Sequence, residues 1–155
     1  MALEDLGRGE NGKAWLCITD TQPFCAVCVL KFDNKGRNMN LQREKNMWHL
    51  LYPEFEPMVK VEMWSGADAL VMPHLATVLT EEREKYRKEV KEVLTAIKSK
   101  AKVHRDVHWR NIGKYSREDG KVVIVVFDLH DVVDYNANTH QIWIEQTMAN
   151  LYPDR

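Results

Sequence analysis

Apolar residues in the first half of the chain come in short segments separated by turn residues, a pattern typical of β-strands. We expect strands over residues 14–19, 24–32, 58–64 and 67–72. Between the second and third of these, apolar residues instead recur every three or four positions, and this segment ends before Pro53. That spacing predicts one helix over residues 39–51.

Helical spacing returns in the second half of the chain. Thr80 is expected to cap a long helix, because two glutamates follow it in the first turn, where carboxylates are favourable. The apolar face of that helix consists of Tyr86, Val90, Val93, Leu94 and Ile97. We then expect a hairpin that turns at residues 116–120, an apolar strand over 121–127 that is buried on both faces, and a last helix over about 139–151.

The composition is that of a single globular domain of 155 residues, of which 45% are hydrophobic and 29% are charged. A net charge of -1 gives no general attraction to nucleic acid or to an anionic membrane, so neither is expected as a partner. We see no signal peptide and no apolar run that could span a bilayer. Three cysteines without framework spacing favour a reducing intracellular compartment, cytoplasmic or nuclear.

Residues 104–111 read H-R-D-V-H-W-R-N, which matches the H-R-D-L-x-x-x-N pattern of the protein kinase catalytic loop except for one conservative change. In that pattern the aspartate accepts the proton of an attacking hydroxyl, and the asparagine holds a metal ion beside the phosphates. Asp106 is therefore the candidate catalytic base and Asn111 a candidate metal ligand.

Asp128 is the second candidate metal ligand. It follows Asn111 by 17 residues, with the expected hairpin between them, and it begins the sequence Asp128-Leu129-His130, where kinases have D-F-G. Two hard oxygen ligands, together with phosphate oxygens and water, suit Mg²⁺. His130 replaces a glycine, which removes backbone freedom from this segment.

Glycines near the start of the chain, Gly7, Gly9 and Gly12, form the pattern G-x-G-x-x-G. A dinucleotide-binding site would have a strand before this pattern and a helix after it, whereas here a strand follows. The context favours a hairpin that covers phosphates with its backbone amides.

Taken together, the order of elements and motifs resembles the protein kinase-like superfamily over about residues 6–135. The resemblance implies an α+β fold with a small β-rich lobe carrying one helix (residues 1–75) and an abbreviated helical lobe (residues 76–155). It implies a cleft for ATP and Mg²⁺ between these lobes.

The lysine that kinases use to hold the phosphates should lie on the strand over residues 24–32, and two registers place it differently. One puts Cys28 at the lysine position and the other puts Lys31 there; the two side chains face opposite sides of a strand. The Cys28 register is preferred, because kinases often carry a further Val-Leu-Lys after the key lysine, and Lys31 is then a solvated surface residue. If Lys31 is the lysine, Glu44 on the first helix is its natural partner.

The resemblance also implies where the adenine would bind. Met72 would back the base, and the backbone of Pro73 and Leu75 would read its edge.

Several features depart from the family pattern. His108 replaces the lysine that neutralises the transferring phosphate, and Arg110 could supply that charge instead. About 25 residues follow His130, so that the helices that usually bind protein substrates are missing. The exposed base must be covered by the last helix, by a partner or by self-association; the apolar residues of that helix are Ile142, Ile144, Met148 and Leu151.

We therefore expect an ATP-binding, Mg²⁺-dependent phosphotransferase whose acceptor is a hydroxyl of a protein or a small molecule. The alternative is a pseudokinase, which binds nucleotide or a partner protein without transferring phosphate. A more distant alternative is a metallohydrolase, whose metal ligands would be His104, Asp106, His108, Asp128 and His130.

Overall fold

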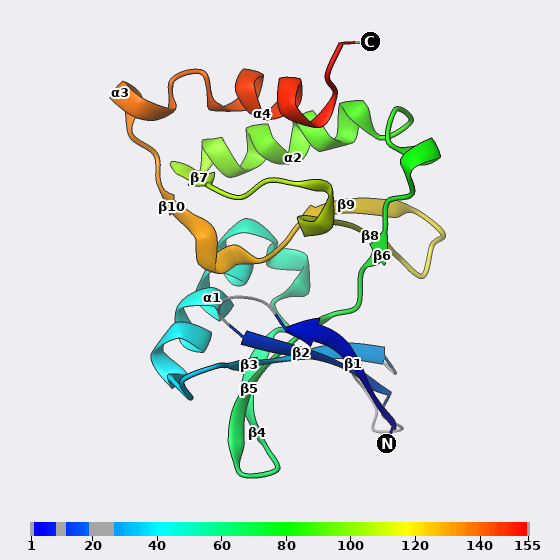
Figure 1. Cartoon of the computed structure of the whole chain (residues 1–155), viewed down its shortest axis with the longest axis vertical. Helices are drawn as coiled ribbons and strands as arrows, with labels where there is room; N and C mark the ends of the chain where they lie inside the picture. Colours follow the sequence, from blue (N-terminus) through cyan, green and yellow to red (C-terminus); the bar gives the residue numbers. More distant parts are fainter. Residues whose placement is uncertain (1, 9–11, 19–26, 155) are drawn as a thin grey trace. The chain divides into compact units, whose positions relative to one another are not determined.

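The computed structural model of the chain describes residues 2–8, 12–18 and 27–154. It divides into two compact units, Met1–His74 and Leu75–Arg155 (Figure 1). Gly9 and the start of the strand expected over residues 24–32 lie outside the described residues. The protein is of the mixed α+β class, with antiparallel sheets and a few helices, as expected.

The first unit is an antiparallel sheet of five strands with one α-helix. The strands occur in the spatial order β1 (Ala2–Arg8), β2 (Gly12–Ile18), β3 (Val27–Asp33), β5 (Ala67–Pro73) and β4 (Lys60–Trp64). Helix α1 (Asn38–Leu51) is followed by the 3-10 turn η1 (Pro53–Phe55). The expected helix and the hairpin that joins β4 to β5 are confirmed; Ser65 and Gly66 make its turn, both at positive φ.

The two faces of this sheet are buried differently. One face carries the apolar cluster of Cys17, Cys28, Leu30, Ala69 and Val71, against which Trp15, Phe32 and Trp64 pack. Lys31 and Leu70, which pair in register, point to the other face because side chains alternate along a strand. Helix α1 contacts β3, β4 and β5 and supplies the buried Leu41 and Trp48.

The second unit is built around α2 (Arg87–Ser99), whose Val90, Leu94 and Ile97 are buried. Helix α2 contacts β7, β9 and α4, and Figure 1 shows α4 beside it. A sheet of three strands has the order β6 (Ala76–Thr77), β8 (Ile112–Ser116) and β9 (Val122–Val126), and a two-stranded sheet pairs β7 (Lys102–His104) with β10 (Val132–Asp134). The remaining elements are η2 (Thr80–Glu82), η3 (Trp109–Asn111), η4 (Leu129–Asp131), α3 (Ala137–His140) and α4 (Trp143–Leu151).

Three expectations for this unit are wrong in detail. Thr80 does not cap the long helix, because Glu82 accepts hydrogen bonds from Leu79 and Lys114 and so closes a separate 3-10 turn before α2. The last helix is two helices, the first of which is capped by Asn136. The strand after the hairpin is not buried throughout, since Val122 is 38% exposed.

Helix α4 packs on α2 and buries Ile144 and Leu151, two of the apolar residues expected to cover the base of this unit. Ile142 is 53% exposed. Among the described residues, no helix has the length and apolar character needed to cross a membrane.

Candidate functional site

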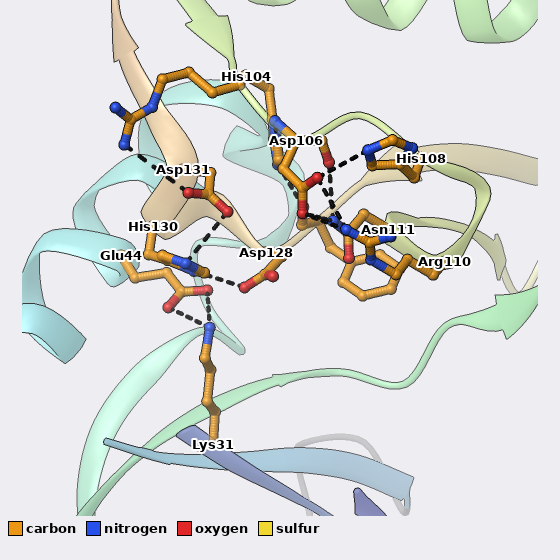
Figure 2. A network of polar contacts seen from close by, with 12 residues as sticks. Lys31, Glu44, His104, Asp106, His108, Arg110, Asn111, Asp128, His130 and Asp131 are labelled. Carbon is orange, nitrogen blue, oxygen red and sulfur yellow. Dashed lines mark hydrogen bonds and ion pairs between the residues drawn. The ribbon is translucent and has the colours of Figure 1, made fainter. Parts of the chain in front are cut away.

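In the first unit, Lys31 forms an ion pair with the buried carboxylate of Glu44 (Figure 2). The Nζ atom of Lys31 lies 2.9 Å and 3.1 Å from the two carboxylate oxygens of Glu44. The Lys31 side chain is 14% exposed and that of Glu44 is 3% exposed. Two charges removed from water in this way are stable only as a pair, so strand β3 and helix α1 hold a fixed ammonium group between them.

Asp33 sets the start of the helix that carries Glu44. Its carboxylate accepts hydrogen bonds from the backbone amides of Lys35 and Arg37, at 2.9 Å and 3.0 Å, and from the side chains of Arg37 and Asn40, both at 3.2 Å. Burial raises the pKa of Asp33, but these hydrogen bonds outweigh it and hold the pKa well below its ordinary value. The carboxylate therefore joins the end of β3 to the first turn of α1.

Lys31 and Cys28, the two candidates for the lysine position, lie on opposite faces of the sheet. Lys31 lies on the face of the sheet that α1 covers, whereas Cys28 is 5% exposed within the apolar cluster on the opposite face. The interpretation of Lys31 as a solvated surface residue was therefore wrong, and the preferred Cys28 register does not place Cys28 beside Glu44. Alternation along the strand had shown that only one of the two side chains could face the helix.

Two glycines of the G-x-G-x-x-G pattern are described, and each has a structural reason to be glycine. Gly7 has a φ of 118° at a register shift between β1 and β2. A Cβ atom on Gly12 would lie 2.4 Å from the carbonyl oxygen of Phe32, so that strand β3 could not approach as closely. These two positions are explained by sheet geometry, which leaves phosphate binding there a prediction.

The residues expected to contact adenine lie where β5 ends. Met72 pairs with Val29 and Pro73 pairs with Cys28 in the sheet register, and both Met72 and Pro73 are buried. Leu75, which begins the second unit, is half-buried and packs closely against Gly113.

In the second unit, Asp106 is the centre of a network of polar contacts (Figure 2). Its carboxylate accepts two hydrogen bonds from Arg110 Nη2, at 2.9 Å and 3.0 Å, and one from Asn111 Nδ2 at 3.1 Å. His108 Nε2 lies 3.0 Å from the same carboxylate. Asn111 is 5% exposed and also donates to the Asp106 carbonyl oxygen at 2.9 Å. The expected catalytic residues thus contact one another, with the Asp106 carboxylate between the Arg110 guanidinium and the His108 imidazole.

His104 holds this loop against the end of β9. Its Nε2–H donates to the Phe127 carbonyl oxygen at 2.7 Å, and its Nδ1 accepts the Asp106 amide hydrogen at 3.1 Å. The imidazole is 1% exposed, and burial lowers its pKa. One nitrogen must be protonated and the other must not, so the neutral ring is the form that fits. His104 is therefore a structural residue, and the metal-ligand set of the metallohydrolase alternative loses this member.

Asp128 lies close to Asp106 because the strands between them pair. Ile112 pairs with Val126, and the amide of Phe127 donates to the Asn111 carbonyl oxygen at 2.9 Å. The hairpin of β8 and β9 thus brings residues 111 and 127 together. Asp128 itself has a φ of 62° and a ψ of 55°, a left-handed conformation that aspartate tolerates better than most residues.

Asp131 is a site residue that the sequence analysis missed. The Nδ1 atom of His130 lies 2.7 Å from Asp128, its Nε2 atom lies 3.2 Å from Asp131, and Arg105 Nη2 lies 3.9 Å from Asp131 (Figure 2). Asp106, Asp128 and Asp131 can each direct one oxygen to a common point, since these oxygens lie within 4.8 Å of one another. The available signal was a second acidic residue three positions after Asp128, with a histidine between them.

This donor set suits a hard divalent cation. Carboxylate oxygens are the ligands that Mg²⁺ prefers, and one or two of them leave positions for phosphate oxygens and water. The site is partly open, since the side chains of Asp106, Asp128 and Asp131 are 31%, 29% and 24% exposed. Asn111, the other expected ligand, points its amide nitrogen at Asp106, which leaves its amide oxygen as the atom that could bind the cation.

The fold and these contacts define an α+β protein with an acidic, oxygen-rich cluster in its second unit. A comparison with protein-family models shows that the chain belongs to a family of unknown function, DUF5898, whose model matches residues 5–115. The match includes Lys31, Glu44 and the loop from His104 to Asn111, and it ends before Asp128. No curated protein matches the chain.

Proposed function

We propose that this protein is kinase-like, binds ATP with Mg²⁺ and transfers a phosphoryl group to a hydroxyl acceptor. The observation that carries the proposal is the meeting of Asp106, Asn111 and Asp128 in the second unit. Asn111 is hydrogen-bonded to Asp106, and the carboxylates of Asp106 and Asp128 are close enough to share a ligand. A base, an amide and a second carboxylate in this sequence order are the parts that the protein kinase pattern uses for phosphoryl transfer.

Asp128 and Asn111 would hold the cation, and Asp131 extends the donor set that the sequence predicted. Bound Mg²⁺ would neutralise charge that develops on the phosphate oxygens. His130 contacts both Asp128 and Asp131 and so fixes the directions of their carboxylates. The left-handed backbone at Asp128 turns the chain so that Asp128 and Asp131 lie on the same side of the segment.

Asp106 would orient the acceptor hydroxyl and take its proton on a carboxylate oxygen. Arg110 and His108 now contact that carboxylate, so at least one of these contacts must open to admit the acceptor. Once released, the Arg110 guanidinium or the His108 imidazole could stand beside the transferred group, which is the task that a lysine performs in the family pattern.

The first unit would contribute the ammonium group of Lys31. Glu44 holds the Lys31 Nζ atom with both carboxylate oxygens, as the lysine that contacts the nucleotide phosphates is held in kinases. Gly7, Gly9 and Gly12 would cover the phosphates, and the backbone from Met72 to Leu75 would bind adenine. These roles follow from the resemblance and from the ion pair.

A second candidate function is nucleotide binding without transfer. One observation favours it: the Asp106 carboxylate already accepts three hydrogen bonds and lies against His108. A carboxylate that keeps these contacts in the nucleotide complex cannot accept the proton of a hydroxyl. Both candidates require Asp128 for metal-dependent nucleotide binding, and they differ only at Asp106.

The proposal is tested with ATP labelled at the γ-phosphate, offered with Mg²⁺ and a panel of small alcohols, amino acids and acidic or basic proteins. Transfer of the labelled phosphate to the protein itself and to water is measured in parallel. We expect Asp106→Asn to lower the transfer rate by about 10²–10⁴-fold while nucleotide affinity is kept. Asp119→Asn, the same change in the exposed turn between β8 and β9, is the control. Full transfer by Asp106→Asn would exclude the catalytic role, and binding without transfer to any acceptor would favour the second candidate.

A further inference from the structure

Both ends of the loop from His104 to Asn111 are held by helix α4 through tryptophan side chains. The indole nitrogen of Trp143, at the start of α4, donates to the His104 carbonyl oxygen at 3.1 Å. The indole nitrogen of Trp109, within the loop, donates to the carbonyl oxygen of Leu151, the last residue of α4, at 3.2 Å. Helix α4 therefore contacts the loop at two points that are a helix length apart.

The contact at the far end of α4 is reinforced by a stack of rings and guanidinium groups. Tyr152 meets Trp109 edge to face, with ring centroids 5.3 Å apart and an interplanar angle of 88°. Arg83 lies over the Trp109 ring at 4.8 Å, and Arg87 lies over the Tyr152 ring at 4.4 Å. Aromatic and cation–π contacts of this geometry stabilise the packed rings beyond the burial of their apolar surface.

Tyr152 also ties the stack to the segment before α2. Its hydroxyl donates to the Arg83 carbonyl oxygen at 2.8 Å. Burial raises the pKa of the Tyr152 phenol to about 12, so that the hydroxyl stays protonated and keeps donating at ordinary pH. The same residue thus fixes Arg83, which covers one side of Trp109, and contacts the Trp109 ring itself.

Trp109 matters because of its neighbours in sequence. It is followed directly by Arg110 and Asn111, and all three form the 3-10 turn η3. Both of these following side chains reach back to the Asp106 carboxylate. A turn of three residues has little backbone freedom of its own, so a shift of the Trp109 backbone is passed on to Arg110 and Asn111.

We infer that Trp109 and Tyr152 are positioning residues, through which the end of α4 fixes the geometry of Asp106 and Asn111. The inference rests on the proposed function for its chemical meaning, since Asn111 and Asp106 are the groups that would meet the metal and the acceptor. Neither Trp109 nor Tyr152 touches the acidic cluster through any contact described above. Their effect on the cluster passes through the backbone of η3.

Two variants remove separate parts of this arrangement, and a third provides a matched control. Tyr152→Leu removes the edge-to-face contact and the hydroxyl, and Trp109→Phe keeps a ring but removes the bond to Leu151. Tyr135→Leu makes the same change at a half-buried tyrosine of the same unit, whose ring contacts His140 and Lys98 instead. Tyr152→Phe, which loses only the bond to Arg83, serves if Tyr152→Leu does not fold.

The first measurement is hydrogen–deuterium exchange at the amides of Arg105, Asp106 and Asn111, each of which is hydrogen-bonded. We expect Tyr152→Leu and Trp109→Phe to speed exchange at these amides by about tenfold or more, with strand β3 unchanged and Tyr135→Leu without effect. The second measurement is the affinity for Mn²⁺, used alone as a probe of the acidic cluster. The same two variants should weaken it by about tenfold, the size typical for residues that support metal ligands.

These measurements separate the inference from the proposed function. Unchanged exchange at the three amides in both variants, or an equal change in Tyr135→Leu, would overturn the positioning role. If wild-type protein binds no Mn²⁺, the proposed metal site fails, and the exchange comparison still decides whether α4 fixes the loop. Faster exchange at the amides with an undiminished Mn²⁺ affinity would show that the loop is anchored but that its geometry does not set the site, which would also overturn the inference.

Discussion

Breaking the Lys31–Glu44 pair should cost far more than breaking an exposed pair of the same residues. We propose Lys31→Met, Glu44→Gln and the double variant. Lys31→Met leaves the Glu44 carboxylate, which is 3% exposed, without its ammonium partner. Removing one partner of a buried pair costs about 3–5 kcal/mol, whereas replacing both with groups of similar shape is often close to neutral.

The double-mutant cycle isolates the interaction from the separate effects of each change. We expect a coupling energy of at least about 2 kcal/mol, because both single variants leave a charge buried and the double variant leaves none. The control is the pair Lys88 and Glu92 on α2, which is 3.7 Å apart with side chains 85% and 63% exposed. Lys88→Met and Glu92→Gln should couple by about 0.5 kcal/mol or less.

The free energy of unfolding is measured by urea denaturation, with tryptophan fluorescence and far-ultraviolet circular dichroism as probes and the slope m checked for each variant. A coupling energy at Lys31 and Glu44 no larger than that of the control pair would refute the reasoning. It would mean that the ammonium group is not held in a buried position, and the proposed phosphate-binding role of Lys31 would lose its structural support.

Three further predictions concern the groups that shape the two units. Because the pKa of Asp33 is lowered in the folded protein, its contribution to the free energy of unfolding is fully present above the ordinary value of 3.8 and is lost as the pH falls through the lower folded value. Asp33→Asn should therefore lower the free energy of unfolding by about 1–3 kcal/mol at pH 7, measured by urea denaturation, and by progressively less below pH 3.8. A difference that stays constant with pH would contradict this prediction. Because the pKa of His104 is lowered in the folded protein, its contribution to the free energy of unfolding is fully present above pH 6.5 and declines as the pH falls below that value. The melting temperature of His104→Gln should therefore decline less between pH 7 and pH 5 than that of wild type. An unchanged profile would argue against a buried neutral imidazole. Gly12→Ala should lower stability by about 1–3 kcal/mol in thermal denaturation, because its Cβ would meet the Phe32 carbonyl oxygen at 2.4 Å, and a change below about 0.5 kcal/mol would contradict that close approach.

Much of the fold could be predicted from local patterns. Helix α1 and the hairpin of β4 and β5 follow from apolar spacing and turn residues. The start of α2 could not be predicted in this way, because Glu82 accepts a hydrogen bond from Lys114, which is 32 positions away in the sequence. The apolar pattern alone did not predict strand β1, since its sequence Ala-Leu-Glu-Asp-Leu-Gly-Arg has too few apolar residues to show alternation. Only the glycine pattern indicated a hairpin there, and β1 is a strand because it pairs with β2.

The candidate site was predictable in part for similar reasons. The loop at Asp106 carries a spaced motif, which can be read directly. The sequence could not show which face of β3 lies against helix α1, because apolar residues occupy both sets of alternate positions. Val27 and Val29 lie on the side of Lys31, and Leu30 lies on the side of Cys28. Asp131 joins the site only through the left-handed turn at Asp128 and the bridge at His130, and neither has a sequence signature.

Nucleotide binding that depends on metal is the central claim, and calorimetric titration of ATP measures it most directly. ATP would be added to wild type, Asp128→Asn and the control Asp119→Asn, each with Mg²⁺ and with a chelator. We predict micromolar binding to wild type and Asp119→Asn only when Mg²⁺ is present, and its loss in Asp128→Asn. An absence of binding to wild type, or binding that neither the chelator nor Asp128→Asn weakens, would contradict the claim.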